Sequence, residues 1–208
     1  MILLVAGSAK RCPAALKQHV GDFIQPQRWG HVAQTRMWAA DNDCFSGFNE
    51  DRYRRMLDRI VTAVTRWDCT PPQFVTLPDV VGNHDATLQL WGHWHRHLGE
   101  RNLNRAFVLQ NGAERHGWKG IPWDYIEALF IGGDTDFKLS RFARDMAAVG
   151  RWMGKWIHMG RVNGLRRLRY AVDIGCHSCD GSSMGRFAED KLIPMAASLN
   201  QLTLFNAL

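Results

Sequence analysis

The sequence contains no unbroken apolar run approaching ~18 residues, the length that a membrane-spanning helix needs. It also has no internal repeat and no low-complexity linker. With 46% hydrophobic and 22% charged residues, the composition excludes a disordered tail or a collagen-like fibre. A chain of 208 residues with this balance predicts a single domain spanning residues 1–208.

Cysteine is scarce and irregularly spaced. The five cysteines are an odd number scattered along the chain, which argues against a disulfide framework. The opening MILLVAGSAK has a short apolar run and no basic segment before it, so it predicts a buried strand rather than a secretory signal. We therefore expect reduced thiols and a cytoplasmic protein, in the host cytoplasm if the chain is phage-encoded.

Acidic residues are outnumbered by basic ones. The chain has 26 Lys and Arg against 20 Asp and Glu, a net charge of +6 that favours a polyanionic partner. The arginines form two groups, each of which fits either a solvated helix face or a phosphate-binding stripe. The groups are Arg52, Arg54, Arg55 and Arg59, and Arg161, Arg166, Arg167 and Arg169.

Short apolar runs alternate with longer amphipathic segments, a pattern typical of βα units around a parallel sheet. Seven or so units in so short a chain predict an α/β fold, a compact or trimmed TIM-like (β/α) barrel. The predicted strands are Ile2–Ala6, Thr35–Ala40, Gln73–Leu77, Ala106–Gln110, Ala128–Gly132, Trp156–Met159 and Ile174–Cys179. The predicted helices are Asn49–Trp67, Ala86–Glu100, Asp136–Gly150 and Asn163–Val172.

Polar residues and glycines follow most of these strands in order. In a parallel barrel the active site lies where the strands end and the loops begin, so these positions predict one shared site. They are Asp41, Asp79, Gln110, Gly132 and Gly133, Met159 and Gly160, and Asp180.

The segment from Trp156 to Ser182, WIHMGRVNGLRRLRYAVDIGCHSCDGS, resembles the late-barrel segment of the tRNA-guanine transglycosylases. The frame places Asp180 on that family's nucleophilic aspartate, with His177 and Cys179 at positions where the family has Asp and Phe. Earlier segments follow in the family's order. They are Asp41-Asn42-Asp43-Cys44-Phe45, Pro78-Asp79, Val108-Leu109-Gln110-Asn111-Gly112 and Ile131-Gly132-Gly133.

The tRNA enzymes carry a Cys-x-Cys-x-x-Cys…His zinc site after the nucleophile, and no cysteine follows Cys179. The chain is also far shorter than those enzymes. It is therefore most similar to the small phage and bacterial relatives that insert 7-deazaguanines, such as 7-cyano-7-deazaguanine, into DNA. This resemblance implies a barrel that lacks the family's C-terminal zinc subdomain.

The resemblance also implies a role for individual residues. Asp180 would be the covalent nucleophile, and Asp41 the second carboxylate. Phe45 and Met159 would enclose the base. The residues that would hydrogen-bond to the polar edges of the base are Asn42, Asp79, Gln110, Gly132 and Gly133. Those that would bind the nucleic acid are Arg161, Arg166, Arg167 and Arg169.

The partners implied are DNA and a free 7-deazaguanine base, with no membrane, metal or cofactor, and a homodimer as in the family. Three alternatives stay open. One is a tRNA enzyme, and another is a basic nucleic-acid-binding module without catalysis. The third is a metal-dependent phosphoesterase, suggested by Gly82-Asn83-His84-Asp85 and Gly92-His93-Trp94-His95, although no Asp-x-His accompanies them.

Overall fold

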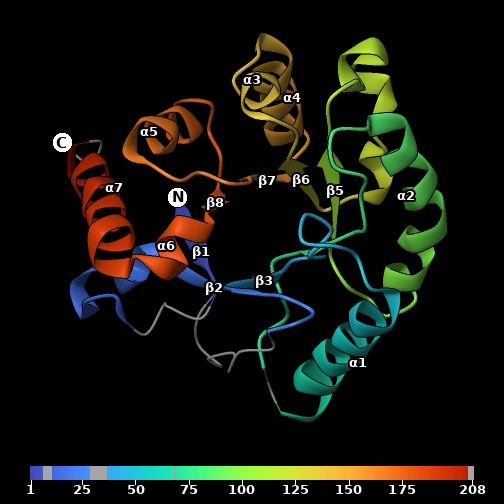
Figure 1. Cartoon of the computed structure of the whole chain (residues 1–208), viewed down its shortest axis with the longest axis horizontal. Coiled ribbons are helices and arrows are strands. Elements are labelled where there is room, and N and C mark those ends of the chain that lie inside the picture. Colours follow the sequence, from blue (N-terminus) through green and yellow to red (C-terminus); the bar gives the residue numbers. More distant parts are fainter. Residues whose placement is uncertain (7–10, 29–36, 68, 206–208) are drawn as a thin grey trace.

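The computed structural model describes residues 1–6, 11–28, 37–67 and 69–205. Their strands form a closed barrel in which each strand pairs in parallel with the next and β8 pairs with β1 (Figure 1). This confirms the predicted α/β class and TIM-like barrel. The strands are β1 Ile2–Val5, β2 Val20–Ile24, β3 Trp38–Ala40, β4 Val75–Thr76, β5 Arg105–Leu109, β6 Ala128–Ile131, β7 Trp156–Met159 and β8 Ser178–Asp180.

The sequence prediction missed β2, so the barrel has eight strands rather than about seven. In the segment VGDFI, Gly21 and Asp22 interrupt the apolar pattern that marks a buried strand. Gly21 is required by packing, since a Cβ there would lie 2.6 Å from the Met37 carbonyl oxygen. Gly21 therefore obscures the strand in the sequence for the same reason that it is needed there, since its missing side chain lets the neighbouring segment at Met37 approach.

Two further predictions were wrong in their details. Of the strand predicted over Ile174–Cys179, only Ser178 and Cys179 lie in β8, because Ile174 caps the end of α5 and the chain then turns through Gly175 at φ +77°. The helix predicted over Asp136–Gly150 is two helices, because the Ser140 side chain caps a new one by accepting from the Ala143 N–H. Residues 35 and 36 of the predicted strand Thr35–Ala40 lie outside the described residues.

The barrel closes within a short chain because several connections are reduced. A 3₁₀ helix, Ala14–His19, joins β1 to β2, and three short 3₁₀ segments replace the helix between β5 and β6. None of the described helices is long and apolar enough to cross a membrane. The full-sized connections are α1 Glu50–Arg66, α2 His84–Gly99, α3 Thr135–Lys138 with α4 Arg141–Trp152, and α5 Leu165–Asp173.

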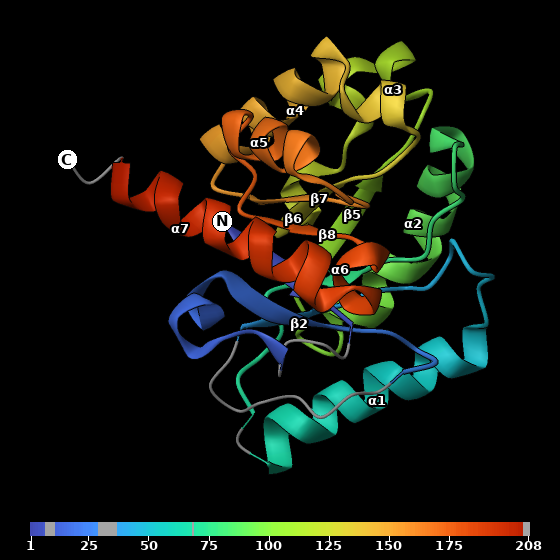
Figure 2. The same ribbon diagram turned by 60° about the vertical axis from the view of Figure 1, so that its left-hand side comes forward.

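The C-terminal segment supplies the cover that the first connection lacks. After β8 come α6 Ser182–Arg186, a π-helical turn at Ala188–Leu192 and α7 Ile193–Phe205. Helix α7 packs against the 3₁₀ helix Ala14–His19 and against α5, beside the N-terminus (Figure 2). The C-terminal segment thereby covers this side of the barrel, with α6 against β1 and α7 against the first connection.

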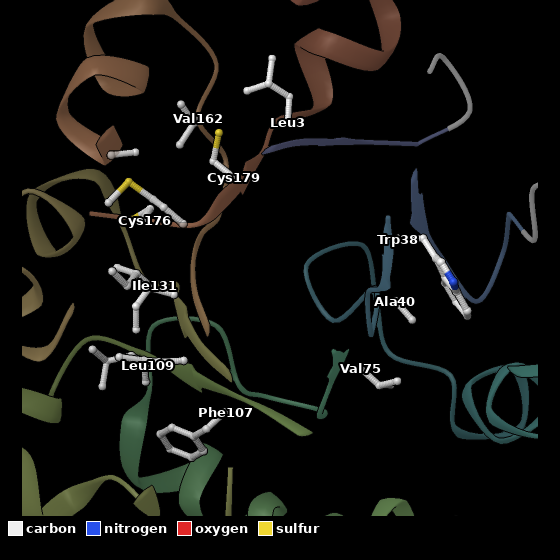
Figure 3. Packing of buried hydrophobic residues seen from close by; sticks show 14 of the residues in the cluster. Leu3, Trp38, Ala40, Val75, Phe107, Leu109, Ile131, Val162, Cys176 and Cys179 are labelled. Atoms are coloured by element: carbon white, nitrogen blue, oxygen red, sulfur yellow. The ribbon is translucent and has the colours of Figure 1, made fainter. Parts of the chain in front are cut away.

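Alternate strand residues divide the core into two layers, as the two-residue period of a strand requires. The outer layer lies between strands and helices and includes Leu3, Ala40, Leu109 and Cys179 (Figure 3). The inner layer fills the barrel itself. Its buried members are Leu4, Phe23, Ala39, Phe74, Ala106 and Ala128, with Ile2, Met37, Phe130 and Trp156 packed against them.

Candidate active site

One pocket opens at the carboxyl ends of the strands, and it gathers most of the residues predicted from the sequence. It has a volume of about 90 Å³, and its lining includes Phe23 and Phe130 from the top of the inner core. The predicted residues that line it are Asp41, Asn42, Phe45, Asp79, Gln110, Gly132, Gly133, Arg161 and Asp180.

The strand period explains why these residues meet. Val108 and Gln110, Phe130 and Gly132, and His158 and Gly160 are each two residues apart, so each pair continues one inward-facing column. The last member of each column lines the pocket. The site is therefore the uppermost layer of the barrel interior, left open because glycines end two of the columns.

Met159 is the one predicted base-contacting residue that the structure places elsewhere. It is 1% exposed and belongs to the outer core layer, on the side of β7 facing the helices. Its neighbours His158 and Gly160 face the barrel interior instead. The expected sandwich of the base between Phe45 and Met159 is therefore wrong, because a shift of one residue along a strand reverses the facing side.

Asp180 ends β8 and is held by a buried histidine. His158, which is fully buried, places Nε2 3.0 Å from Asp180 Oδ1 and Nδ1 2.8 Å from Ser178 Oγ. Trp156 Nε1–H donates to the same Ser178 oxygen at 2.8 Å. Because Ser178 Oγ receives that donor, its own hydroxyl proton is free for Nδ1, which leaves the imidazole proton on Nε2, directed at Asp180.

A second donor reaches the same carboxylate oxygen. The backbone N–H of Arg161 lies 3.3 Å from Asp180 Oδ1, on a residue in the left-handed region at φ +61°. Both hydrogen bonds therefore converge on Oδ1. Among the described contacts this leaves Oδ2 as the oxygen available to a bound molecule.

Asp41 follows β3 and shares the pocket with Asp180. Burial and the nearby Asp180 carboxylate raise the pKa of Asp41 from 3.8 to about 7. Gln25 Nε2 donates to it at 3.3 Å and the Asn42 N–H at 2.9 Å, and both oppose the rise without cancelling it. Near neutral pH this carboxyl group is poised to give or to take a proton.

Asp79, after β4, is the centre of a hydrogen-bonded set that also includes two amides. Asn42 Nδ2 donates to its Oδ1 at 2.7 Å, and Gln110 Nε2 donates to its Oδ2 at 2.6 Å. The Gln110 carbonyl accepts from the Gly82 N–H at 2.9 Å, which fixes the orientation of the amide. Burial raises the pKa of Asp79 in spite of these donors.

Glycines let the backbone form the pocket wall. A Cβ on Gly160 would lie 2.5 Å from Phe130 Cε1, and Gly133 has φ +74° with its Cβ position 2.7 Å from Asn111 Oδ1. Neither position accommodates a side chain without movement of its neighbours. The Gly132 N–H donates to the Leu109 carbonyl oxygen, so of the two glycines it is Gly133 whose backbone N–H can donate to a ligand.

An aromatic ring and a guanidinium form the rim of the pocket. Phe45 is 64% exposed, and the Arg161 guanidinium carbon lies 4.1 Å from its ring centroid. Together the ring and the guanidinium form a flat, partly apolar surface at the rim, of the kind on which a base can stack.

Lys138, at the end of α3, was not predicted from the sequence, yet it lines the pocket and is only 5% exposed. Burial lowers its pKa to about 8, and the neighbouring Arg161 and Arg167 act in the same direction. Asp180 opposes them. A lysine five residues beyond a glycine pair belongs to no motif of its own, so only the fold shows where it lies.

A wider hollow of about 260 Å³ adjoins the pocket on the β1 and β2 side. Phe23 and Asp180 line both spaces, so the nucleophile predicted from the sequence lies where they meet. The hollow is lined in addition by Arg28 and Arg186, whose side chains are exposed. A ligand with a flat polar head and an anionic tail could span the two.

The predicted nucleic-acid-binding arginines do not act as one group. Arg161 lines the pocket, and Arg167 donates to the Arg161 carbonyl oxygen at 3.3 Å and to Thr135 Oγ1 at 3.1 Å. Arg166 and Arg169 are exposed on α5 and line neither space. Three arginines of α1, Arg52, Arg55 and Arg59, line a separate groove of about 350 Å³.

The residues that suggested a metallophosphoesterase have other partners. The Asn83 side chain caps α2 by accepting from the Ala86 N–H, and Asp85 pairs with Arg115 and His116. His84 is buried beside Phe107. Within the described ranges, no three His, Cys, Asp or Glu side chains form a group that could hold a metal ion.

No protein-family model and no curated protein matches this chain. Among solved structures it is similar to one titled "Native KDPGal structure", at 12% identity and a TM-score of 0.45, covering 86% of this chain and 80% of that one. It is also similar to "PaMucR Phosphodiesterase, c-di-GMP complex", at 17% identity and a TM-score of 0.38, covering 72% and 67%. Likeness at this level says nothing about chemistry. The resemblance to guanine transglycosylases rests on the quoted motifs.

Proposed function

We propose that the protein is a guanine transglycosylase that exchanges guanine in DNA for a free 7-deazaguanine base, such as 7-cyano-7-deazaguanine. The observation that carries the proposal is the position of Asp180. It lines both a narrow pocket whose walls carry carboxylates, amides and glycines and a wider hollow whose lining includes Arg28 and Arg186. An N-glycosidic bond laid across this junction would put its base in the pocket and its sugar and phosphate in the hollow.

The narrow pocket offers groups that match guanine. The N1 and N2 hydrogens of guanine can be accepted by one carboxylate, and Asp79 is held for this by Asn42 and Gln110. O6 needs a donor, and the second Gln110 amide hydrogen and the Gly133 N–H supply candidates. Phe45 at the rim would cover one face of the ring.

In the proposed reaction, Asp180 Oδ2 attacks C1′ of the target nucleotide as the C1′–N9 bond breaks. The bonding electrons leave with guanine, which takes a proton from Asp41 and departs neutral. C1′ is held as a covalent aspartyl-glycosyl intermediate, as in retaining glycosidases. The incoming base gives a proton back to Asp41 and attacks C1′, which releases the Asp180 carboxylate.

The buried His158 acts in this scheme as a positioning residue. Its Nε2–H holds Asp180 Oδ1, so the carboxylate keeps one rotamer with Oδ2 facing the sugar. A histidine fixed from behind by Ser178 and Trp156 cannot swing away when the charge on Asp180 changes.

The nucleic acid must present its base outside the helical stack, because the pocket lies below the rim of the barrel. Flipping a base costs a few kcal/mol, which phosphate contacts can offset. Arg28 and Arg186 line the hollow, and under this proposal they would contact the target nucleotide's own phosphates. The choice of DNA over tRNA follows the resemblance to the small relatives, and the experiment below tests both.

The test is transfer of labelled guanine or labelled 7-cyano-7-deazaguanine into duplex DNA and into tRNA, in EDTA, by the wild type and by Asp180→Asn. We expect label in DNA with the wild type alone, and a protein–DNA adduct that survives denaturing electrophoresis. Asp173→Asn is the matched control, because Asp173 is exposed on α5.

Each other outcome has a definite meaning. Label in tRNA alone would keep the chemistry and overturn the partner. Exchange that persists in Asp180→Asn would overturn the nucleophile. DNA binding without exchange of either base would replace the enzyme with a binding module, and exchange abolished by EDTA would contradict a reaction without metal.

A second candidate function is favoured by Lys138. A buried amine with a pKa of about 8 beside two arginines has the character of a Schiff-base nucleophile. Its amine would add to the carbonyl of a keto acid, and water would leave as the imine formed. Borohydride reduction in the presence of pyruvate should then add mass to Lys138, whereas under the transglycosylase proposal it adds none.

A further inference from the structure

We propose that Lys138 selects the substituent at position 7 of the incoming base. Its ammonium would donate a hydrogen bond to an acceptor at that position and would repel a cation. This rests on the proposed function, since it presumes a 7-deazaguanine in the pocket. It predicts a preference for the 7-cyano base over the 7-aminomethyl base.

The order of strands around the barrel locates position 7. Asp79 follows β4 and Asp180 ends β8, on opposite sides of the barrel, so β5, β6 and β7 lie between them on one side and β1, β2 and β3 on the other. A guanine-like ring with N1 and N2 on Asp79 and N9 toward Asp180 has two edges left. One edge carries O6, position 7 and C8 in sequence, and the other carries N3.

The groups on the two sides of the pocket decide which edge faces which way. The β5 to β7 side begins with Gln110, a donor suited to O6, and continues with Lys138 from the segment after β6. The other side carries Asp41, whose proton suits the N3 edge. With O6 at Gln110, position 7 falls beside the next group along, which is Lys138.

The surroundings of Lys138 make its charge available to a ligand. Thr135–Lys138 is a single helical turn, capped by the Asp134 side chain, which accepts from the Phe137 N–H. No described residue is hydrogen-bonded to the Lys138 ammonium, although Asp180 and Asp134 act on it electrostatically. Arg161 and Arg167 are cations on the same side.

This arrangement distinguishes ligands by chemistry. An ammonium on a flexible stem can donate to the N7 lone pair of guanine or to a nitrile nitrogen. A 7-aminomethyl group is itself a cation at neutral pH, and it would meet Lys138 and Arg161, the two cations that line the pocket, with Arg167 as a further positive charge near Lys138. Like charges brought together in this way are a strong means of rejecting a ligand.

The test measures equilibrium binding of three free bases, guanine, 7-cyano-7-deazaguanine and 7-aminomethyl-7-deazaguanine, by calorimetry at pH 7. The proteins are the wild type, Lys138→Gln, Lys138→Glu and, as matched control, Lys17→Glu, whose side chain is exposed before β2. Circular dichroism melts establish that each variant is folded. Exchange of labelled guanine is measured in parallel.

We expect the wild type to bind the cyano base about 100-fold more tightly than the aminomethyl base. Lys138→Gln should reduce that ratio about 10-fold, and Lys138→Glu should invert it, while Lys17→Glu leaves it unchanged. If Lys138→Glu fails to fold, Lys138→Gln still decides the matter.

The two proposals fail in different ways. A wild-type ratio retained in both Lys138 variants overturns the inference about Lys138 while leaving the transglycosylase proposal intact. A wild type that binds none of the bases overturns both. A preference for the aminomethyl base in the wild type also overturns the reading of position 7, whatever the exchange assay shows.

Discussion

The two ends of the barrel treat their charged groups in opposite ways. At the carboxyl end, burial raises the pKa of Asp41 and of Asp79, and Lys138 is buried with its pKa lowered. At the amino end, Glu127 accepts from the Arg105 backbone N–H at 2.6 Å and from its guanidinium at 2.8 Å. These donors hold the pKa of Glu127 below its usual value although burial opposes them.

This contrast helps to choose between two candidate sites. A separate hollow of about 400 Å³ opens at the amino end of the barrel, beside Glu127, Arg151, Trp156 and His177. By volume alone the amino-end hollow would be the better candidate site, yet the Glu127 carboxylate there is already paired with Arg105. Groups held in unfavourable protonation states mark functional sites more often than satisfied ion pairs do. The smaller pocket at the carboxyl end is therefore the better candidate.

The strongest test of the difference between the two ends is to alter one carboxylate at each. Asp180→Asn should lower exchange at least about 10⁴-fold, as loss of a covalent nucleophile does, with little change in melting temperature. Glu127→Gln should leave the exchange rate within about twofold, because it touches no ligand. Steady-state exchange and thermal melts on both variants decide it, and equal losses of activity would abolish the distinction between the ends.

A second prediction concerns the pH dependence of stability at the carboxyl end. Since the folded-state pKa of Asp41 is raised to about 7, ionising it disfavours the folded state. Its cost is absent below about pH 4, grows as pH rises toward 7 and is constant above. Asp41→Asn should therefore gain about 2–4 kcal/mol in unfolding free energy over wild type at pH 8, and almost none at pH 4.

Urea titrations from pH 4 to pH 8 measure that gain. The matched control is Asp173→Asn on the exposed face of α5, which should show no pH-dependent difference. A gain in Asp41→Asn that is the same at both pH values would contradict burial of an ionisable Asp41 in the folded protein.

A third prediction probes the space that glycine leaves at the top of β7. Gly160→Ala places a Cβ against Phe130 and 3.5 Å from Asp180 Oδ1, so Phe130 must move into the pocket. We expect destabilisation of about 1–3 kcal/mol, as for overpacked sites, and a rise in the KM for the free base. Gly154→Ala at the amino-end hollow is the companion variant, with open space around its Cβ position but φ +71°. It should change stability alone.

The smallest expected effect is at the amino end itself. Glu127→Gln should cost about 1 kcal/mol at pH 7, because the pair with Arg105 is partly exposed. The pKa of Glu127 is lowered in the folded state, so this contribution is present above the ordinary glutamate pKa and is lost as pH falls through the folded value. The difference from wild type should therefore shrink in acid, and a difference that grows there would contradict the ion pair.

Much of the candidate site was accessible to sequence reasoning because strand ends meet at one edge of a barrel. Asp41, Gln110 and Asp180 each follow or end an apolar strand, and each lines the pocket. Met159 was misplaced because the strand's facing side depends on a register that the apolar letters WIHM do not reveal. His158 could have been found by counting two residues back from Gly160.

Other features had no signal of that kind. The strand β2 was hidden by Gly21 and Asp22, and its place followed only from pairing with β1 and β3. Lys138 reads as an ordinary residue in a polar segment. Its burial arises from the split between α3 and α4, which turns the single turn Thr135–Lys138 toward the pocket.

By itself the sequence determined the alternation of strands and helices, the polar residue or glycine at most strand ends, and the excess of arginine. These are local properties, set by period and by residue type, and so they can be read one segment at a time. The tertiary structure alone decided that β8 closes on β1, that His158 meets Asp180 and that the pKa of Asp41 is raised. Each of these depends on groups far apart in the chain, because burial and charge act through space.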